Sequence, residues 1–417
     1  MGIAINIGQT GLLASSKQLD VIGNNLANSS TVGFKASSTL FANMMNQGLS
    51  SMGALSVGQG VGVASLPTDY SQGSFETTGN NTDMAIDGEG FFLVEDPAGA
   101  SYYTRAGAFH IDNNSNLVDI RGYKVEGYSM TNDTLSNVPT DIVLQKSMDA
   151  STTTEVSFGA NLDASATAAV AATATTPAIP GDTFEVSETV YDSLGASHTL
   201  SLTFEKTDAS TWDVTGTFDG DTGVTISTTT VGFDETGALT SPAGDATITI
   251  APTDATILGD ATIGNGGVLN WLLTTDTSRS LTGYASDSTV RSLYADGFAA
   301  GELSSLSVDN KGIISGVYTN GQSLELYQVA LATFQDQTSL IKNGNYYLQS
   351  TGSGAPIIKP AGSGGVGNIQ SSSLEASNTD VSKEFIRMIA AQRAYQANAK
   401  VITTADDMLT ELMNIKR

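Results

Sequence analysis

The sequence predicts a mainly β chain with an α-helix at each end, organised as a discontinuous multidomain protein. Apolar residues recur at alternating four- and three-residue steps at both termini, the spacing of a helix that packs against another helix. Between the termini, short runs of alternating apolar and polar residues separated by turn residues are typical of strands. A chain of 417 residues is also too long for a single hydrophobic core, so two or three domains are expected.

The terminal stripes predict helices over 1–28 and 375–417 that pair with each other as a coiled coil. The first stripe starts at Met1 and is interrupted at Gly8 and Ser15. We expect these stripe residues to form the helix pairing and the subunit interface: Ile5, Leu12, Leu19, Ile22, Leu26, Phe385, Met388, Tyr395, Ile402, Leu409 and Met413. The second helix would be roughly 50 Å long. Its stripe therefore needs the opposite terminus and neighbouring subunits, although the same spacing also suits an ordinary helical hairpin.

The ends of these helices carry further signals. Asn378 or Asp380 is expected to cap the second helix, and Glu384 lies in its first turn, where the helix dipole favours a carboxylate. Gly8 and Gly11, with Gly23, weaken the first helix by about 1 kcal/mol each relative to alanine. We therefore expect the first helix to be disordered in the isolated monomer.

The middle of the chain differs from its ends in charge. The formal net charge is −25, and between Ser147 and Ser278 the only basic side chain is Lys206. This contrast predicts an acidic outer β domain over 147–278, inserted into an inner β domain formed by 73–146 and 279–374. Residues 29–72, rich in Gly, Ser, Met and Asn, are expected to form an extended linker.

Composition excludes several functions. Phosphate contacts need clustered Lys and Arg, so the strong negative charge argues against nucleic-acid binding and against anionic membrane surfaces. The absence of Cys excludes disulfides, thiolate metal sites and Cys nucleophiles. The sequence has no run of 18 apolar residues, so we expect no membrane insertion. The first 30 residues also lack the layout of a cleaved signal peptide.

We expect no catalytic residues, no metal and no cofactor. Asp112, Asn114 and Asn116 have the spacing of a calcium loop, but Leu117 and Tyr123 stand where that loop needs Gly and Glu. A hairpin turn with Asx bonds suits these residues better.

Three other patterns also have an ordinary interpretation. His110 and His198 fall in different predicted domains, which argues against a shared site. The run Gly362–Gly367 opens no helix, so a hinge before the C-terminal helix is preferred to a phosphate site. No two acidic residues of the insertion have a spacing that marks a catalytic pair, so they are expected to form a solvated surface.

Several motifs resemble one family. Residues 19–28, followed by the stretch 31–35, resemble the N-terminal signature of bacterial flagellar rod and hook proteins. Residues 87–92 (DGEGFF) and 103–109 (YTRAGAF) are similar to that family's β-domain motifs, and 374–378 (LEASN) and 392–398 (QRAYQAN) to its C-terminal region. The signature turn comprises Asn24, Asn25, Asn28, Thr31, Gly33, Phe34 and Lys35. It either orders the bend between helix and linker or is only a helix cap followed by a loop.

The resemblance implies a non-enzymatic structural subunit. Chain length and the single large insertion favour a hook member, whose subunits stack helically into a curved tube outside the cell that joins the rotating rod to the filament. The implied partners are further copies of the chain, the rod, hook cap and hook–filament junction proteins, and the flagellar type III export apparatus. Two alternatives remain: a long distal-rod protein and a secreted adhesin-like β protein.

Overall fold

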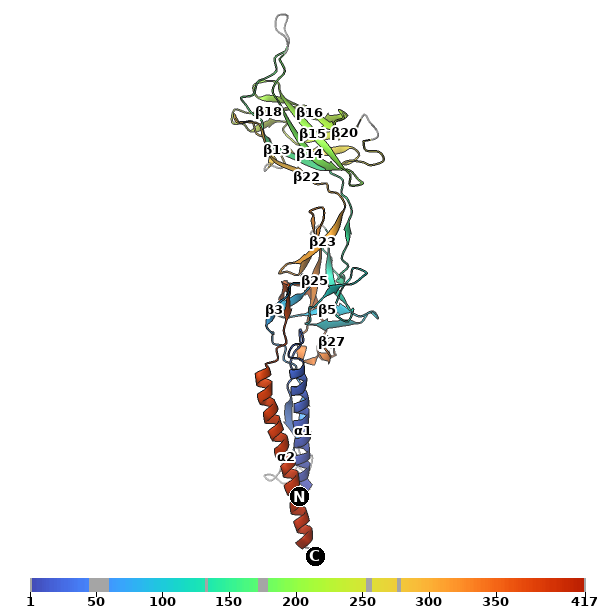
Figure 1. Cartoon of the computed structure of the whole chain (residues 1–417), viewed down its shortest axis with the longest axis vertical. Helices are drawn as coiled ribbons and strands as arrows, with labels where there is room; N and C mark the ends of the chain where they lie inside the picture. The colour runs from blue at the N-terminus through green and yellow to red at the C-terminus, as the bar shows by residue number, and fades with distance from the viewer. Residues whose placement is uncertain are drawn as a thin grey trace. The chain divides into compact units, whose positions relative to one another are not determined.

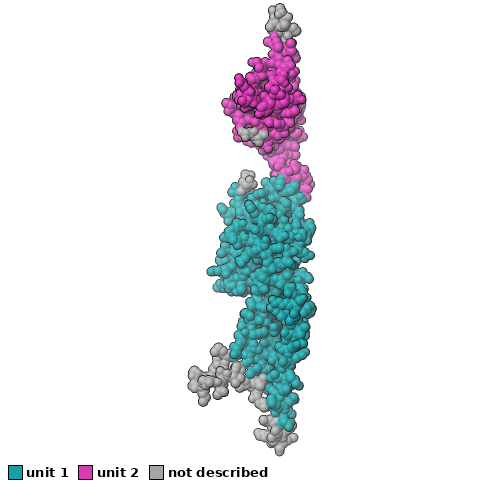
Figure 2. All heavy atoms as spheres, turned by 90° about the vertical axis from the view of Figure 1, so that its left-hand side faces the viewer, with its two compact units in different colours: residues 1–145, 305–317, 323–417 teal, residues 146–304, 318–322 magenta. Residues whose placement is uncertain are grey.

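The computed structural model describes residues 2–44, 60–131, 134–171, 179–252, 257–275 and 279–415. The chain divides into two compact units, and unit 2 (146–304 and 318–322) is inserted into unit 1 (1–145, 305–317 and 323–417; Figure 2). Unit 2 continues to Ser304 and does not end at 278 as expected. The reason is that the strand Thr289–Ala295 pairs with Glu155–Asn161 inside this unit.

Two α-helices lie side by side in unit 1 and run antiparallel (Figure 1). They are α1 (Gly2–Ala27) and α2 (Val381–Ile415). Asp380 caps α2, because its Oδ1 accepts the backbone N–H of Lys383 at 3.1 Å. The predicted fold class, mainly β with two terminal helices that pack together, is therefore confirmed.

The face of α1 that meets α2 consists largely of small residues. Gly8, Gly11 and Ser15 are buried, and Ile22 is buried nearer the end of the helix. A Cβ added at Gly8 would lie 2.7 Å from Cγ1 of Ile402. The positions that interrupt the predicted stripe therefore allow close approach of the helices. Met1, the first residue of that stripe, lies outside the described residues.

The inner face of α2 is shifted by about one residue from the predicted stripe. Ala391, Ala405 and the side chain of Glu384 are buried, and Met388, Ile402 and Leu409 are half-buried. By contrast, Phe385, Tyr395 and Met413 are 48%, 42% and 70% exposed, so they lie outside the inner face. The shift has a steric cause: small residues on both helices let the backbones approach, and these residues were not counted as apolar.

The segment expected to be an extended linker forms strands where it is described. β1 (Leu40–Asn43) and β2 (Val61–Ser65) pair antiparallel, and β2 packs on α1. The Asn25 side chain holds this segment to α1, because its Nδ2 donates to the Ser37 carbonyl at 2.7 Å and its Oδ1 accepts the Ser37 N–H at 3.0 Å.

The β part of unit 1 is built on a sheet with the order β23-β24-β25-β9-β5-β6-β27-β26. Its strands and those around it are β3 Phe75–Thr77, β4 Met84–Asp87, β5 Phe91–Glu95, β6 Ser101–Thr104, β7 His110–Ile111, β8 Leu117–Val118, β9 Lys124–Thr131, β10 Thr134–Leu135, β11 Thr140–Asp141, β23 Gly301–Val308 (which begins in unit 2), β24 Ile313–Tyr318, β25 Ser323–Thr333, β26 Ile341–Asn343, β27 Tyr346–Leu348, β28 Ile357–Pro360, β29 Asn368–Ser371 and β30 Ser373–Glu375. Phe91, Tyr103 and Tyr347 belong to its aromatic core.

Unit 2 contains two five-stranded sheets, β17-β20-β21-β13-β22 and β14-β15-β16-β18-β19. The strands of this unit are β12 Ser147–Met148, β13 Glu155–Asn161, β14 Thr183–Tyr191, β15 Ser197–Lys206, β16 Thr211–Phe218, β17 Val224–Ile226, β18 Thr230–Phe233, β19 Leu239–Ser241, β20 Ala246–Ile250, β21 Val268–Trp271 and β22 Thr289–Ala295. Both sheets contribute to one apolar core, which includes Phe158, Phe204, Trp212 and Trp271.

Candidate functional site at the junction of the terminal segments

The signature turn ends α1 and bends the chain into the β part of unit 1. Asn28 Nδ2 donates to the Asn24 carbonyl at 2.8 Å, and Thr31 Oγ1 donates to Asn28 Oδ1 at 3.1 Å. The Phe34 N–H then donates to the Thr31 carbonyl at 3.2 Å. These side-chain and backbone bonds satisfy groups that the end of a helix leaves unpaired.

Gly33 is required at its position for two reasons. Its φ is +66°, a left-handed conformation that glycine adopts without strain. An added Cβ would lie 2.5 Å from the backbone nitrogen of Ala106. The Gly33 N–H donates to the Glu375 carbonyl at 2.7 Å, so this turn also ties the N-terminal segment to the C-terminal segment.

Three buried charged residues meet beside this turn, and we call Lys35, Arg105 and Glu375 the ion node. Lys35 Nζ lies 2.6 Å from Glu375 Oε1, and Arg105 Nη1 lies 3.4 Å from Glu375 Oε2. Backbone groups complete the node: Gly73 N–H donates to Glu375 Oε1 at 2.9 Å, and Lys35 Nζ donates to the Ser71 carbonyl at 2.7 Å.

The electrostatics of the ion node are those of a desolvated pair. Burial lowers the pKa of Lys35 and of Arg105, while the Glu375 carboxylate acts in the opposite direction on both. Removing one partner of such a buried pair leaves an uncompensated charge, which typically costs about 3–5 kcal/mol. The node is therefore sensitive to the loss of a single side chain.

The ion node joins segments that are far apart in the sequence. Lys35 belongs to the N-terminal signature, Arg105 to the stretch 103–109, and Glu375 to the stretch 374–378. Arg105 Nη2 also donates to the carbonyl of Gly88, within the stretch 87–92, at 3.0 Å. Sequence reasoning singled out Lys35 but not Arg105 or Glu375, although all of these motifs had been noted.

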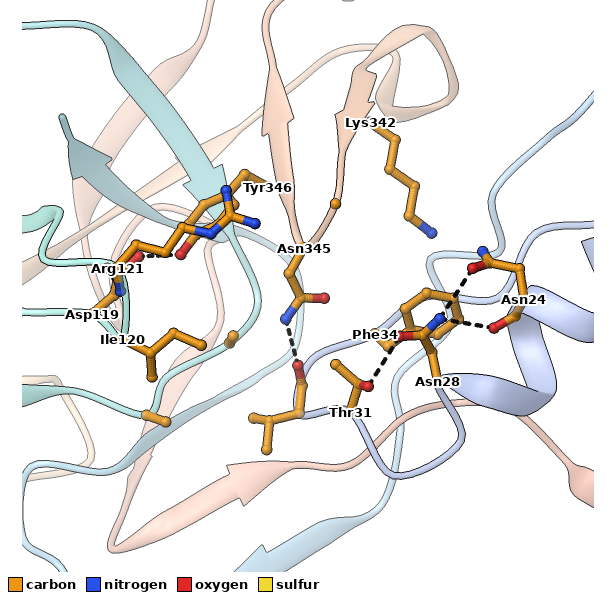
Figure 3. A pocket seen from close by; sticks show the side chains of 14 residues that line it. Asn24, Asn28, Thr31, Phe34, Asp119, Ile120, Arg121, Lys342, Asn345 and Tyr346 are labelled. Atoms are coloured by element: carbon orange, nitrogen blue, oxygen red, sulfur yellow. Dashed lines mark hydrogen bonds between the residues drawn. The ribbon is translucent and has the colours of Figure 1, made fainter.

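Lys342 and Asn345, which sequence reasoning missed, hold the signature turn from the other side (Figure 3). Lys342 Nζ donates to the Lys35 carbonyl at 2.7 Å and lies 4.2 Å from the centre of the Phe34 ring. Asn345 Nδ2 donates to the Val32 carbonyl at 2.8 Å. Burial lowers the pKa of Lys342 to about 8. Nothing in the local sequence of β26 and β27 indicated this role.

A cavity of about 630 Å³ opens beside the signature turn (Figure 3). Phe34, Lys342 and Tyr346 belong to its walls, and Tyr346 is fixed by a hydrogen bond to Asp119 Oδ2 at 2.5 Å.

The remaining patterns form turns. Asp112 Oδ1 accepts the N–H groups of Asn114 and Asn116 at 2.8 and 2.7 Å, the expected Asx geometry. The run Gly362–Gly367 connects β28 to β29, and its ends are joined by a 2.9 Å backbone bond. It is a closed turn between strands, not the expected hinge directly before α2. His110 and His198 lie in different units.

Two general features concern the described residues as a whole. Within them, no group of three or more His, Asp or Glu side chains is arranged to hold a metal ion. Neither helix, in the part of the chain that the structure describes, is long and apolar enough to cross a membrane.

Four family models match the chain in order. They are a flagella basal body rod protein model at 5–35, the flagellar hook protein FlgE/F/G D1 domain at 85–161, the flagellar basal body protein FlaE D2 domain at 161–298 and the flagellar basal body rod FlgEFG protein C-terminal model at 370–415. The rod protein match covers the signature turn up to Lys35, and the C-terminal match includes Glu375.

Relatives that match nearly the whole chain are each named flagellar hook protein FlgE. The chain is 35% identical to the flagellar hook protein FlgE of Salmonella typhimurium and 33% identical to that of Borreliella burgdorferi, with 98% of each chain covered. It is 33% identical to the Escherichia coli hook protein, with 99% of this chain and 100% of that protein covered. The crystal structure of Helicobacter pylori flagellar hook protein FlgE2 has a similar fold, with a TM-score of 0.50 at 15% identity over 72% of this chain and 100% of that one. The alternative of a distal-rod protein is not favoured, and the chain belongs to the flagellar hook protein family as a structural subunit of the hook.

Proposed function

We propose that the terminal helices carry the contacts by which copies of this chain polymerise into a curved tube that transmits torque from rod to filament. The single observation that supports this is that α2 leaves large apolar side chains exposed from its first turn to its last. Phe385, Ile386, Ile389, Val401, Met408 and Met413 are each at least 40% exposed in the single chain. Exposed apolar side chains along a helix that is already paired on one side are typical of contacts with further protein molecules.

The polymer geometry follows from the use of two different faces. The inner face of α2 is occupied by α1 of the same chain, so the outer face contacts a neighbouring copy. Contacts between unlike surfaces do not close on themselves, and they generate helical assemblies from one kind of chain. Torque then passes along a continuous set of paired helices, while the outer domains slide against their neighbours as the tube bends once per revolution.

The partners follow from this role. The chain contacts further copies of itself along the tube, and rod, hook cap and hook–filament junction proteins at the ends. It leaves the cell through the flagellar type III export apparatus, and it functions in the extracellular hook. Marginal helices and the absence of Cys support this route, because a narrow channel passes an unfolded chain.

One pair of substitutions separates the two faces. Ile386→Asp changes a residue that is 70% exposed, and Ile22→Asp changes one that is 4% exposed. Ile386→Asp should abolish sedimentable polymer while the far-UV circular dichroism of the helices stays as in the unmodified chain. Ile22→Asp should abolish the sedimentable polymer and also the helical circular dichroism signal. Normal polymer from the Ile386→Asp chain would exclude the outer face of α2 as the subunit interface.

A further inference from the structure

A turn at residues 119–123 presents an isoleucine to solvent at the cavity beside the signature turn. Ile120 is 77% exposed, more than any other large apolar side chain of the described residues. Figure 3 shows Ile120 and Arg121 on one side of the cavity, with Phe34 and Lys342 on the other. A single exposed apolar residue is ordinary on a protein surface. Ile120, however, extends the apolar lining of a cavity.

The formation of the turn does not explain this isoleucine. In six turns of the described residues, an Asp Oδ1 accepts the backbone N–H groups of the residues two and four positions further on. The residues that directly follow these six aspartates are Pro97, Asn113, Ile120, Ser193, Glu235 and Asn310. Five of the six are polar or are proline, as is typical of exposed turns. The turn therefore forms without a large apolar side chain at this position.

The turn that carries Ile120 is held firmly in place. Asp119 Oδ1 accepts the N–H groups of Arg121 and Tyr123 at 2.8 and 3.0 Å, and Asp119 Oδ2 accepts the Tyr346 hydroxyl at 2.5 Å. The Arg121 guanidinium lies 4.6 Å from the centre of the Tyr346 ring. A surface that is ordered before binding loses little conformational entropy when a partner covers it. Ile120 is therefore presented in a form suited to docking.

The cavity walls also carry positive charge. Among the described residues, neither Arg121 nor Lys342 forms an ion pair with a carboxylate, and Lys342 Nζ donates to the Lys35 carbonyl. The chain has only 18 Lys and Arg against 43 Asp and Glu, so two such cations at one cavity stand out. Charge complementarity favours an acidic partner. A second copy of this chain, with its net charge of −25, provides one.

We propose that Ile120, Arg121 and the cavity beside them form a subunit contact that receives an acidic and partly apolar surface of a second copy. This contact uses the β part of unit 1 and is separate from the outer face of α2. Residues of the signature turn line the same cavity, so the second copy also covers the segment that follows α1. The inference rests on the proposed polymer.

A single thiol measures the burial of this turn directly. The chain contains no Cys, so Ile120→Cys introduces its only thiol. A small fraction of this variant is copolymerised with an excess of the unmodified chain, and maleimide modification is timed in the tubes and in the dilute, unpolymerised variant. The position is 77% exposed when the chain's own terminal segments are in place, so protection reports a second copy. We expect modification in the tubes to be slower by about tenfold or more.

The outcomes separate this contact from the proposed function. Equal modification rates in tubes and in the dilute variant would overturn the contact while the tubes themselves stand. Absence of tubes from the unmodified chain would remove the proposed function together with the contact.

Ile120→Ser tests the apolar part of the contact, because serine stands at the same position of the Asp192 turn. The chain concentration at which sedimentable polymer appears should rise about tenfold or more, since less apolar surface leaves water. The urea midpoint of unit 1 should not change. Asn310→Ser is the matched control, at the same position of the Asp309 turn, and should polymerise as the unmodified chain does. No rise for Ile120→Ser, or an equal rise for Asn310→Ser, would overturn the proposal.

Two substitutions of Arg121 test the charge. Arg121→Gln removes the cation and should raise the concentration needed for polymer, whereas Arg121→Lys keeps the charge and should restore most of the assembly at the same ionic strength. Normal assembly of the Arg121→Gln chain would contradict an acidic partner surface at this site.

Discussion

Lys35 in unit 1 and Lys206 in unit 2 are 0% and 1% exposed, but different groups compensate their charges. Lys35 meets the Glu375 carboxylate, 340 residues further along the chain. Lys206 Nζ donates to the carbonyl oxygens of Asp163 and Ala164 and lies 5.6 Å from the centre of the Trp212 ring. The carbonyl groups that accept from Lys206 belong to the same unit as this lysine. The Lys35–Glu375 pair, by contrast, forms only when segments from both ends of the chain lie together.

This difference determines how strongly each unit is destabilised when a buried charge is lost. Unit 2 is stabilised by one apolar core, and its buried Lys206 is not a member of that core. The junction of unit 1 depends on a few directional contacts between segments from the two ends of the chain. Loss of one charge should therefore disturb the junction more than loss of one charge disturbs unit 2.

The largest effect is expected from Lys35→Met. Glu375 would lose its shortest ion pair and keep only Arg105 at 3.4 Å and the Gly73 N–H. We expect the free energy of unfolding of unit 1 to fall by about 3 kcal/mol. Urea unfolding followed by helical circular dichroism reports this unit. Both tryptophans, Trp212 and Trp271, lie in unit 2, so their fluorescence should show an unchanged midpoint for that unit.

An intermediate effect of opposite sign is expected from Glu126→Gln in β9. Burial, together with the Glu95 and Asp141 carboxylates, raises the pKa of Glu126 to about 7 from its ordinary 4.5. The folded chain therefore keeps a proton that the unfolded chain has lost between pH 4.5 and 7, so stability falls as the pH rises through this range.

Glu126→Gln should consequently stabilise unit 1 at pH 8, by about 2 kcal/mol, and leave its stability at pH 4 unchanged. The measurement is the urea midpoint of the helical signal at both pH values. An equal change at pH 4 and pH 8 would show that the effect is one of packing and not of charge.

The smallest effect is expected from Lys206→Met. The carbonyl groups of Asp163 and Ala164 lose a donor, and the Trp212 ring loses the charge that lies 5.6 Å from its centre. We expect the free energy of unfolding of unit 2 to fall by about 1 kcal/mol, because the groups left without a donor are neutral carbonyls and not a charged carboxylate. Tryptophan fluorescence should report this loss while the helical signal keeps its midpoint. A loss as large as that of Lys35→Met would remove the distinction between the two lysines.

The sequence predicted the elements better than the contacts between them. Heptad spacing predicted both terminal helices, and alternating runs predicted strands such as β14 and β15. The inner faces were predicted only in part: Ile22, Met388 and Ile402 lie on them. Small residues at the close contact, such as Gly11 and Ala391, were not counted in the stripe, and Phe385, which was counted, is 48% exposed.

The junction was predicted only in part, for a physical reason. The signature turn has local signals, because glycine, asparagine and threonine are typical of helix ends and bends. An ion pair between residues far apart in the sequence leaves no periodicity and no local composition to detect. Arg105 and Glu375 were therefore noted only as parts of motifs, and Lys342 was not noted at all.

The structure also decides where the chain should be cut to test the central claim, that the terminal helices drive assembly. A deletion starting at 375 would remove Glu375 and Asn378 and so damage the junction, whereas deletion of 380–417 keeps the ion node and removes only α2 with its cap. The most direct measurement is electron microscopy of this shortened chain beside the full chain under polymerising conditions. We expect curved tubes from the full chain and folded monomers from the shortened one. Tubes formed by the shortened chain would contradict the claim.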